Sequence, residues 1–158
     1  MLMGEFPELI PAVKALASIL GSDLKTVVLF GSRSRGQESR QSDYDLLIVA
    51  ENLPLEPIAR LGRIRTALAE MTLPINTVAK TPDELDHQLT PLLLDICVDG
   101  RCLFGEEFFE PRRAQALSAL KASGLKRKWR GRTSSWSFDR PMNREWELDW
   151  EGFHELAR

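Results

Sequence analysis

The sequence predicts an α/β fold, a mixed β-sheet flanked by helices, from three observations. Short apolar runs rich in β-branched residues recur along the chain, amphipathic helical patterns separate them, and the connections are short. The 158 residues suffice for one domain with a real core. A hydrophobic content of 43% and a charged content of 28% are ordinary for a globular protein.

The first half of the chain alternates helical and strand patterns. One helical stripe, ended by Gly21, consists of Leu9, Val13, Leu16 and Leu20. The runs "TVVLF" and "DYDLLIVA" predict two strands buried on both faces. A second helical stripe, with Pro54 and Pro57 near its start, consists of Leu61, Ile64, Leu68 and Met71.

The second half continues the alternation. The run "LPINTVAK" predicts a third strand, and "TPDE" after it is a capping box formed by Thr81 and Glu84. Thr90 and Pro91 start another helix, which Gly100 ends. "RCLF" predicts a final strand, and residues from about 111 to 122 predict a last helix.

The composition changes near Gly124, which predicts a core domain over residues 1–123 and a Trp-rich tail over 124–158. All four tryptophans lie in this tail. Trp146, Trp150 and Phe153 have the spacing of one helical face. Two alternatives are left for these aromatic residues. They pack on the sheet of the same chain, or they pack on a partner, which can be a second copy of the chain.

The charge and the lack of targeting signals argue against nucleic-acid-binding, secreted and membrane-spanning proteins. The net charge of −2 gives no basic excess, and the basic "LKRKWRGR" precedes an acidic stretch, so self-complementary packing is favoured over nucleic-acid binding. We expect Cys97 and Cys102 to be reduced. The sequence shows neither a signal-peptide pattern nor an apolar run long enough for a membrane span, which predicts a cytoplasmic protein.

The turn "GSRSRG" has the features that hold a polyphosphate. Gly31 lets the backbone approach phosphate oxygens, and Ser32 adds a hydroxyl donor. A helical turn beginning here would add free N–H groups. Arg33 and Arg35 add positive charge, with ordinary solvent-facing positions as the alternative for both.

Two aspartates stand at the head of the second predicted strand. Asp43 and Asp45 share one face of that strand because alternate residues do, whereas Tyr44 points the other way and is expected to pack. Mg²⁺ prefers one or two carboxylates together with substrate phosphates. The pair therefore predicts a magnesium site.

The spacing of the turn and the aspartates resembles a known signature. "GSRSRGQESRQSDYDLLIV" is similar to the motif of the minimal nucleotidyltransferases of the DNA polymerase β superfamily, and the likeness covers roughly residues 5 to 105. It implies that Gly31 and Ser32 hold the nucleotide phosphates and that Asp43 and Asp45 bind Mg²⁺. The predicted nucleotide-binding set also includes Arg33, Arg35 and Ser42.

The resemblance also identifies one departure. The family usually supplies a third carboxylate from the next strand, and the matching residue here is Asn76. An amide oxygen can ligate a metal but cannot take a proton as a carboxylate can. A missing general base lowers the rate by about 10²- to 10⁴-fold, so nucleotide binding is a safer prediction than turnover. Asp83, Glu84, Asp86 and Asp95 are weaker candidates to replace it.

The resemblance implies a nucleotidyltransferase that moves a nucleoside monophosphate to a hydroxyl, with AMP from ATP as the leading choice. Small members of the family are commonly antitoxins of HEPN-domain toxins, some of which they AMPylate, so a HEPN partner is the leading acceptor. The alternative is a catalytically weakened antitoxin that neutralises its partner by contact. Modification of a small molecule ranks third, because relatives that do so carry a larger second domain. His87 and His154 are predicted to be surface residues.

Overall fold

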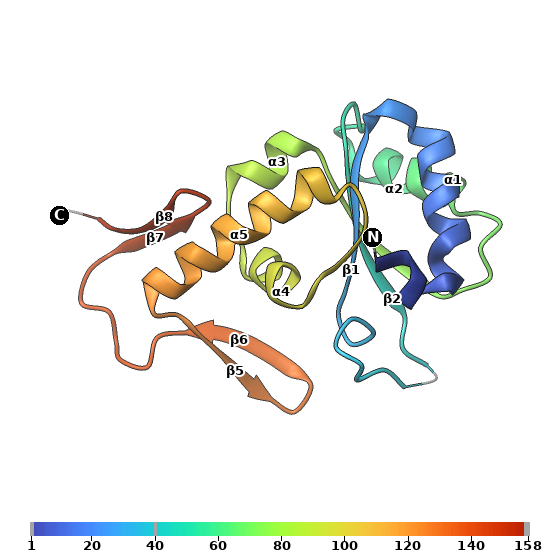
Figure 1. Cartoon of the computed structure of the whole chain (residues 1–158). Helices are drawn as coiled ribbons and strands as arrows, with labels where there is room; N and C mark the ends of the chain where they lie inside the picture. Colours follow the sequence, from blue (N-terminus) through green and yellow to red (C-terminus); the bar gives the residue numbers. More distant parts are fainter. Residues whose placement is uncertain (1, 40, 157–158) are drawn as a thin grey trace.

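The computed structural model describes residues 2–39 and 41–156. Its centre is a mixed sheet (Figure 1) of four strands. The strand order is β3-β2-β1-β4. β1 pairs antiparallel with β2 and β4, and β2 pairs parallel with β3. The strands are β1 (Leu24–Phe30), β2 (Tyr44–Ala50), β3 (Ile75–Lys80) and β4 (Arg101–Phe104). The predicted fold class is therefore confirmed.

Helices cover both faces of this sheet (Figure 1). One face carries α1 (Ile10–Leu20) and α2 (Pro57–Ala67). The other carries α3 (Pro82–His87), α4 (Pro91–Asp99) and α5 (Glu106–Ser123). Three short 3₁₀ turns complete the first part of the chain: η1 (Leu2–Glu5), η2 (Pro7–Leu9) and η3 (Gly21–Asp23). No helix in the described ranges is both long and apolar enough to cross a membrane.

The two central strands are buried on both faces, as their continuous apolar runs predict. Leu46 and Ile48 join the core beneath α1 and α2, whereas Leu47 and Val49 join the core beneath α3 to α5. Because side chains alternate along a strand, Asp45 lies on the same face as Leu47 and Val49. The second helical layer therefore lies on the face that carries Asp45.

The helix starts follow the sequence closely, with one exception. The Thr81 hydroxyl accepts from Glu84 N–H in a complete capping box, and Thr90 caps α4 in the same way. The last helix was predicted from about residue 111 but begins at Glu106. The carbonyl of Gly105 accepts from two backbone N–H groups in the first turn, and buried Phe109 fixes that turn in the core. These two contacts hold a helix start that precedes Pro111.

The tail forms two hairpins, so the predicted helical face of Trp146, Trp150 and Phe153 is wrong. The hairpins are β5 (Lys126–Arg130) with β6 (Thr133–Ser137), and β7 (Trp146–Asp149) with β8 (Gly152–Glu155). The Asp149 carboxylate accepts from the backbone N–H groups of Glu151 and Gly152 at 2.8 and 3.0 Å. Gly152 has φ +146°, a value that favours glycine. This local turn outweighs the helical spacing.

The hairpins pack on the helices α3 to α5 rather than directly on the sheet (Figure 1). Leu125 and Leu148 are each only 7% exposed, and Trp150 Nε1 donates to the carbonyl of Leu85 at 2.9 Å. Of the two docking places left open by the sequence, the structure therefore shows contact with the same chain, but with its helices.

Candidate functional site

The predicted phosphate turn and the predicted metal ligands meet at one end of the sheet. Asp45 pairs with Phe30 on β1, the residue directly before Gly31, and with Asn76 on β3. A Cβ atom at Gly31 would collide with the Asp45 carboxylate, and Gly31 also has φ +78°. Only glycine therefore brings the turn this close to the acid.

The turn itself is wound like the start of a helix. Ser34 N–H and the Ser34 hydroxyl both donate to the Gly31 carbonyl, at 3.2 and 2.7 Å. The N–H groups of Arg35 and Gln37 donate to the Ser32 carbonyl at 3.2 and 2.9 Å. Within residues 2–39 and 41–156 the Ser32 hydroxyl has no hydrogen-bond partner. Ser34, absent from the sequence prediction, is a positioning residue of this turn.

Asn76 is in contact with the aspartates, at the place where the sequence predicted a third ligand. Asn76 Nδ2 donates to Asp43 Oδ2 at 2.8 Å, and the same amide hydrogen-bonds Asp45. Among the described residues no group of three or more His, Cys, Asp or Glu side chains is placed to hold a metal. The donor set here is two carboxylates and one amide.

Burial raises the pKa of the Asp45 carboxyl above its ordinary value, and the negative charge of Asp43 raises it further. The hydrogen bond from Asn76 and the charge of Arg35 oppose part of this effect. In the described ranges no ion pair involves either aspartate. Two adjacent carboxylates with an adjacent amide oxygen suit a hard divalent cation, which binds oxygen ligands.

Arg33 has contacts that direct it away from the aspartates. Its Nε donates to the Ser42 carbonyl at 2.9 Å and its Nη1 to the Tyr44 hydroxyl at 3.2 Å. The guanidinium carbon lies 4.1 Å from the centre of the Tyr44 ring. Tyr44 is buried on the face opposite Asp45, as predicted, and its hydroxyl donates to Glu8 at 3.1 Å. In this structure Arg33 therefore stabilises the segment before Asp43.

Ser42 also serves the local backbone. Its hydroxyl accepts from the N–H of Ser39 at 2.9 Å, which closes the loop ahead of Asp43. Arg35 is different, because its charge acts on Asp45 while its Nη1 bonds Asp99 at 3.3 Å. Of the residues predicted to bind the nucleotide, Gly31, Ser32 and Arg35 are therefore the ones grouped with the acids.

The acidic residues considered as replacements for the third carboxylate lie in other surroundings, and most of them form ion pairs there. Glu84 completes its capping box and pairs with Arg60, Asp86 pairs with Arg112, and Asp95 pairs with Arg127. Asp83 lies in the first turn of α3. His87 and His154 are exposed, and Cys97 and Cys102 are buried free thiols, as predicted.

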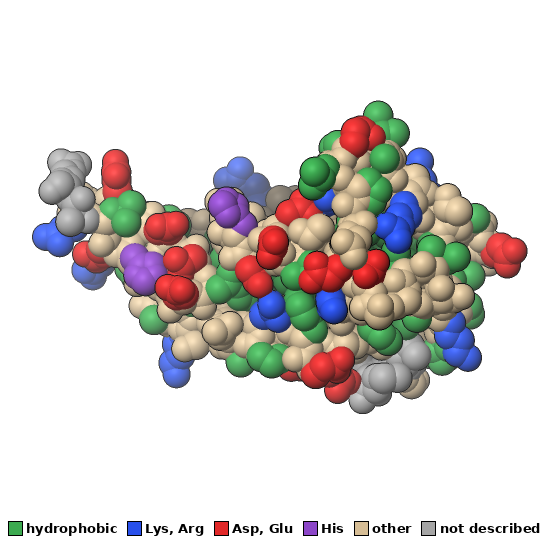
Figure 2. Space-filling view, turned by 90° about the horizontal axis from the view of Figure 1, so that it is seen from above, with side chains coloured by type: hydrophobic (Ala, Val, Ile, Leu, Met, Phe, Trp, Pro, Cys, Tyr) green, Lys and Arg blue, Asp and Glu red, His purple; other side chains and the backbone are tan. Residues whose placement is uncertain are grey.

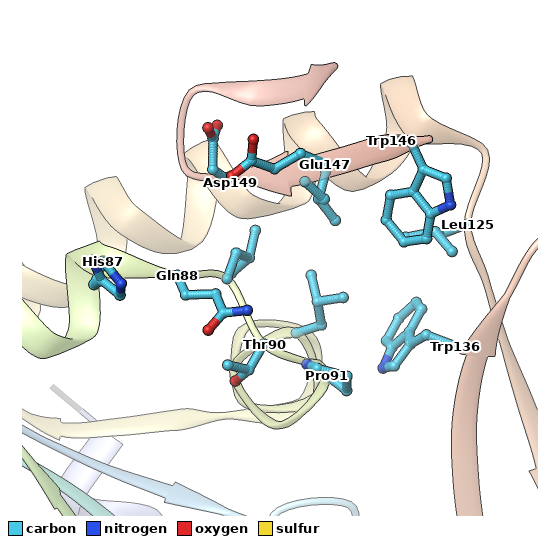
Figure 3. A pocket seen from close by; sticks show the side chains of 12 residues that line it. His87, Gln88, Thr90, Pro91, Leu125, Trp136, Trp146, Glu147 and Asp149 are labelled. Atoms are coloured by element: carbon cyan, nitrogen blue, oxygen red, sulfur yellow. The ribbon is translucent and has the colours of Figure 1, made fainter. Parts of the chain in front are cut away.

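Apart from the proposed site, a hollow of about 290 Å³ separates the tail from the α3–α4 connection (Figure 3). Trp136 and Trp146 form one side of it, and Gln88, Thr90 and Pro91 line the other (Figure 3). Its lining includes Glu147 and Asp149, and acidic side chains lie among basic and histidine side chains at this end of the molecule (Figure 2). Trp146 is 39% exposed, which makes the hollow a mixed apolar and acidic surface.

Comparison with known proteins agrees with this geometry. The "Polymerase beta, Nucleotidyltransferase" family model matches residues 14–107, more than half of the chain. The chain therefore belongs to the polymerase β nucleotidyltransferase family, and the predicted membership is confirmed.

Individual relatives add detail. Over 94 residues the chain is 31% identical to "Putative protein adenylyltransferase MJ1305" of Methanocaldococcus jannaschii, which covers 56% of this chain and 64% of that protein. The chain thus spans less than two thirds of that relative. A toxin–antitoxin crystal structure with AMP-PNP has 24% identity and a TM-score of 0.50, covering 71% of this chain and 88% of the other. A mutant of the toxin–antitoxin pair MntA-HpeT has 20% identity and a TM-score of 0.51, covering 70% and 84%. Both structures share the fold.

Proposed function

We propose that this chain is a Mg²⁺-dependent nucleotidyltransferase that transfers AMP from ATP to a hydroxyl of a partner protein. The observation that carries the proposal is the meeting of the Gly31 turn with Asp43, Asp45 and Asn76 at one end of the sheet. The name of the archaeal relative and the AMP-PNP in the similar complex support the choice of an adenine nucleotide.

The reaction needs little covalent help from the protein. The acceptor oxygen forms a bond to the α-phosphorus of ATP, the bond from that phosphorus to the α–β bridging oxygen breaks, and pyrophosphate leaves. The turn at Gly31 and Ser32 orients the phosphates, while Asp43 and Asp45 hold the cation. Mg²⁺, when bound, supplies charge neutralisation for the phosphates. The hydroxyl proton passes to solvent, because the Asn76 amide is no base.

The acceptor that we propose is a HEPN-domain protein, with this chain as its antitoxin. Support comes from the resemblance and from the similar toxin–antitoxin complexes. The hollow between Trp136, Trp146 and Pro91 is a suitable docking place, because its acidic rim favours an apolar side chain flanked by lysine or arginine.

The test is incubation of the chain with α-labelled ATP, Mg²⁺ and the product of the neighbouring gene, the candidate acceptor. We expect label on that protein, and no label with the Asp43→Ala/Asp45→Ala variant. Exposed Glu51, which follows the end of β2 opposite to Asp45, provides the control Glu51→Ala, which should label like wild type. Label that stays in free nucleotide under all these conditions contradicts the proposal.

A second function, neutralisation by contact alone, is favoured by the amide at Asn76. The same double variant separates the two functions, because it removes metal binding but leaves the hollow intact. If the double variant inhibits the toxin as strongly as wild type, contact is the mechanism. If inhibition is lost together with labelling, the transfer reaction is the mechanism.

A further inference from the structure

Asp99, the last residue of α4, joins two arginines from distant parts of the chain. Arg35 Nη1 lies 3.3 Å from Asp99 Oδ2, and Arg127 Nη2 lies 2.6 Å from the same oxygen. The side chains of Asp99 and Arg127 are each only 12% exposed. Arg127 also pairs with Asp95 at 3.1 Å. Each buried charge in this group therefore has an opposite charge in contact with it.

Trp129 of the β5–β6 hairpin strengthens the same link. The guanidinium carbons of Arg35 and Arg127 lie 5.0 and 4.5 Å from the centre of its ring. Trp136 on β6 donates its Nε1–H to Asp95 at 2.9 Å. The hairpin is thus fixed to α4 by Arg127 and Trp136, and it contacts the phosphate turn through Arg35.

Arg35 is the residue that this link shares with the nucleotide site. It follows Gly31 and Ser32 in the same turn, where its backbone N–H donates to the Ser32 carbonyl at 3.2 Å. The family model ends at residue 107, so the hairpin lies outside the part of the chain that the family describes.

We propose that Arg127 and Trp129 are positioning residues of the nucleotide site, holding Arg35 so that its guanidinium meets the phosphates of bound ATP. This proposal rests on the proposed function. A free arginine side chain loses rotamer freedom when it engages a ligand, whereas a side chain already held by an ion pair and a ring loses less. Release of Arg35 should therefore weaken ATP binding by about threefold to tenfold.

Arg127→Ala, Trp129→Ala and Trp129→Phe test the proposal, with Arg130→Ala as the matched control. Arg130 is exposed, lies on the same strand, carries the same charge, and alternates to the other face from Arg127 and Trp129. Two quantities are measured on the full chain: the Arg35 Nε–H signal by NMR without ligand, and the dissociation constant of ATP with Mg²⁺.

Arg127→Ala and Trp129→Ala should broaden or shift the Arg35 signal and weaken ATP binding, whereas Trp129→Phe and Arg130→Ala should match wild type in both. An unchanged Arg35 signal overturns the proposal, as does equal weakening of binding by Arg127→Ala and Arg130→Ala. A changed signal with unchanged affinity overturns it too. If wild type binds no ATP, the proposed function fails, while the signal still decides whether the hairpin positions Arg35.

Discussion

Asn76 is the residue on which the proposed turnover depends most. It lies on β3 opposite Asp45 and donates to Asp43 at 2.8 Å, so it has the position of a third ligand without a negative charge. It can orient the carboxylates and offer an oxygen to a cation, but it cannot remove a proton. The proposed site therefore groups two carboxylates with one amide, and the feature that it lacks at this position is a general base.

Replacing Asn76 by aspartate should supply that base. We expect Asn76→Asp to raise the rate of AMP transfer by about 10²- to 10⁴-fold, because proton removal from the acceptor becomes assisted. The measurement is the initial rate of labelling of the proposed HEPN-domain acceptor, with Asn76→Ala as the control that removes the amide without adding an acid. A rate for Asn76→Asp at or below wild type shows that no base is missing at this position.

Asp45 should cost stability when it is ionised. Burial and the charge of Asp43 raise its pKa in the folded state, so the folded chain binds this proton more tightly than the unfolded chain. The cost is present at pH above the folded-state pKa and disappears as pH falls through it. We expect Asp45→Asn to raise the Tm by roughly 2–4 °C at pH 8 without metal, and by less in acid.

Bound Mg²⁺ should remove the loss of stability that the ionised Asp45 carboxylate causes. The cation should therefore raise the Tm of wild type at pH 8 but not that of Asp45→Asn. Glu51→Gln makes the same chemical change at an exposed residue past the opposite end of β2, and it should leave the Tm unchanged at every pH. A lower Tm for Asp45→Asn at pH 8 would show that this carboxylate stabilises the fold.

At the scale of the element, the sequence predicts the sheet well because its signals are local. Continuous β-branched runs indicate strands buried on both faces, and Thr81 and Thr90 cap the helices that follow the third strand. The turn at Gly31 and the alternation of Asp43 and Asp45 are also local, and these features bring the turn and the two aspartates together.

Elements whose form depends on contacts are predicted less well. The start of α5 depends on Gly105 and on the burial of Phe109, neither of which appears as a helical repeat. The β7–β8 hairpin depends on one carboxylate, Asp149, that holds a turn against a helical spacing. The link from Arg35 through Asp99 to Arg127 joins residues 64 and 28 positions apart, and a single sequence gives no signal for such pairs.

For the whole molecule, the tail and the core should behave as one cooperative unit. Leu125 and Leu148 share a core cluster with Leu47 and Val49 of the central strand, although the sequence predicts a boundary near Gly124. The tail cannot lose its packing without exposing apolar surface of α5. Near Gly124 the composition of the chain therefore changes while the packing continues.

Intrinsic fluorescence tests directly whether tail and core unfold together, because all four tryptophans lie in the tail. Far-UV circular dichroism mainly follows the helices and sheet of the core. We expect the two signals to change at the same urea concentration in a single transition. A fluorescence midpoint at clearly lower urea would identify the tail as a separate unit that opens first.

The central claim is that one end of this sheet holds ATP on its turn and a divalent cation on its aspartates. A crystal structure with AMP-PNP and Mn²⁺, read by anomalous scattering, tests it most directly. We predict a cation about 2 Å from carboxylate oxygens of Asp43 and Asp45, with phosphates on the backbone of Gly31 and Ser32. Phosphates bound elsewhere, or a cation that touches neither aspartate, would contradict the account.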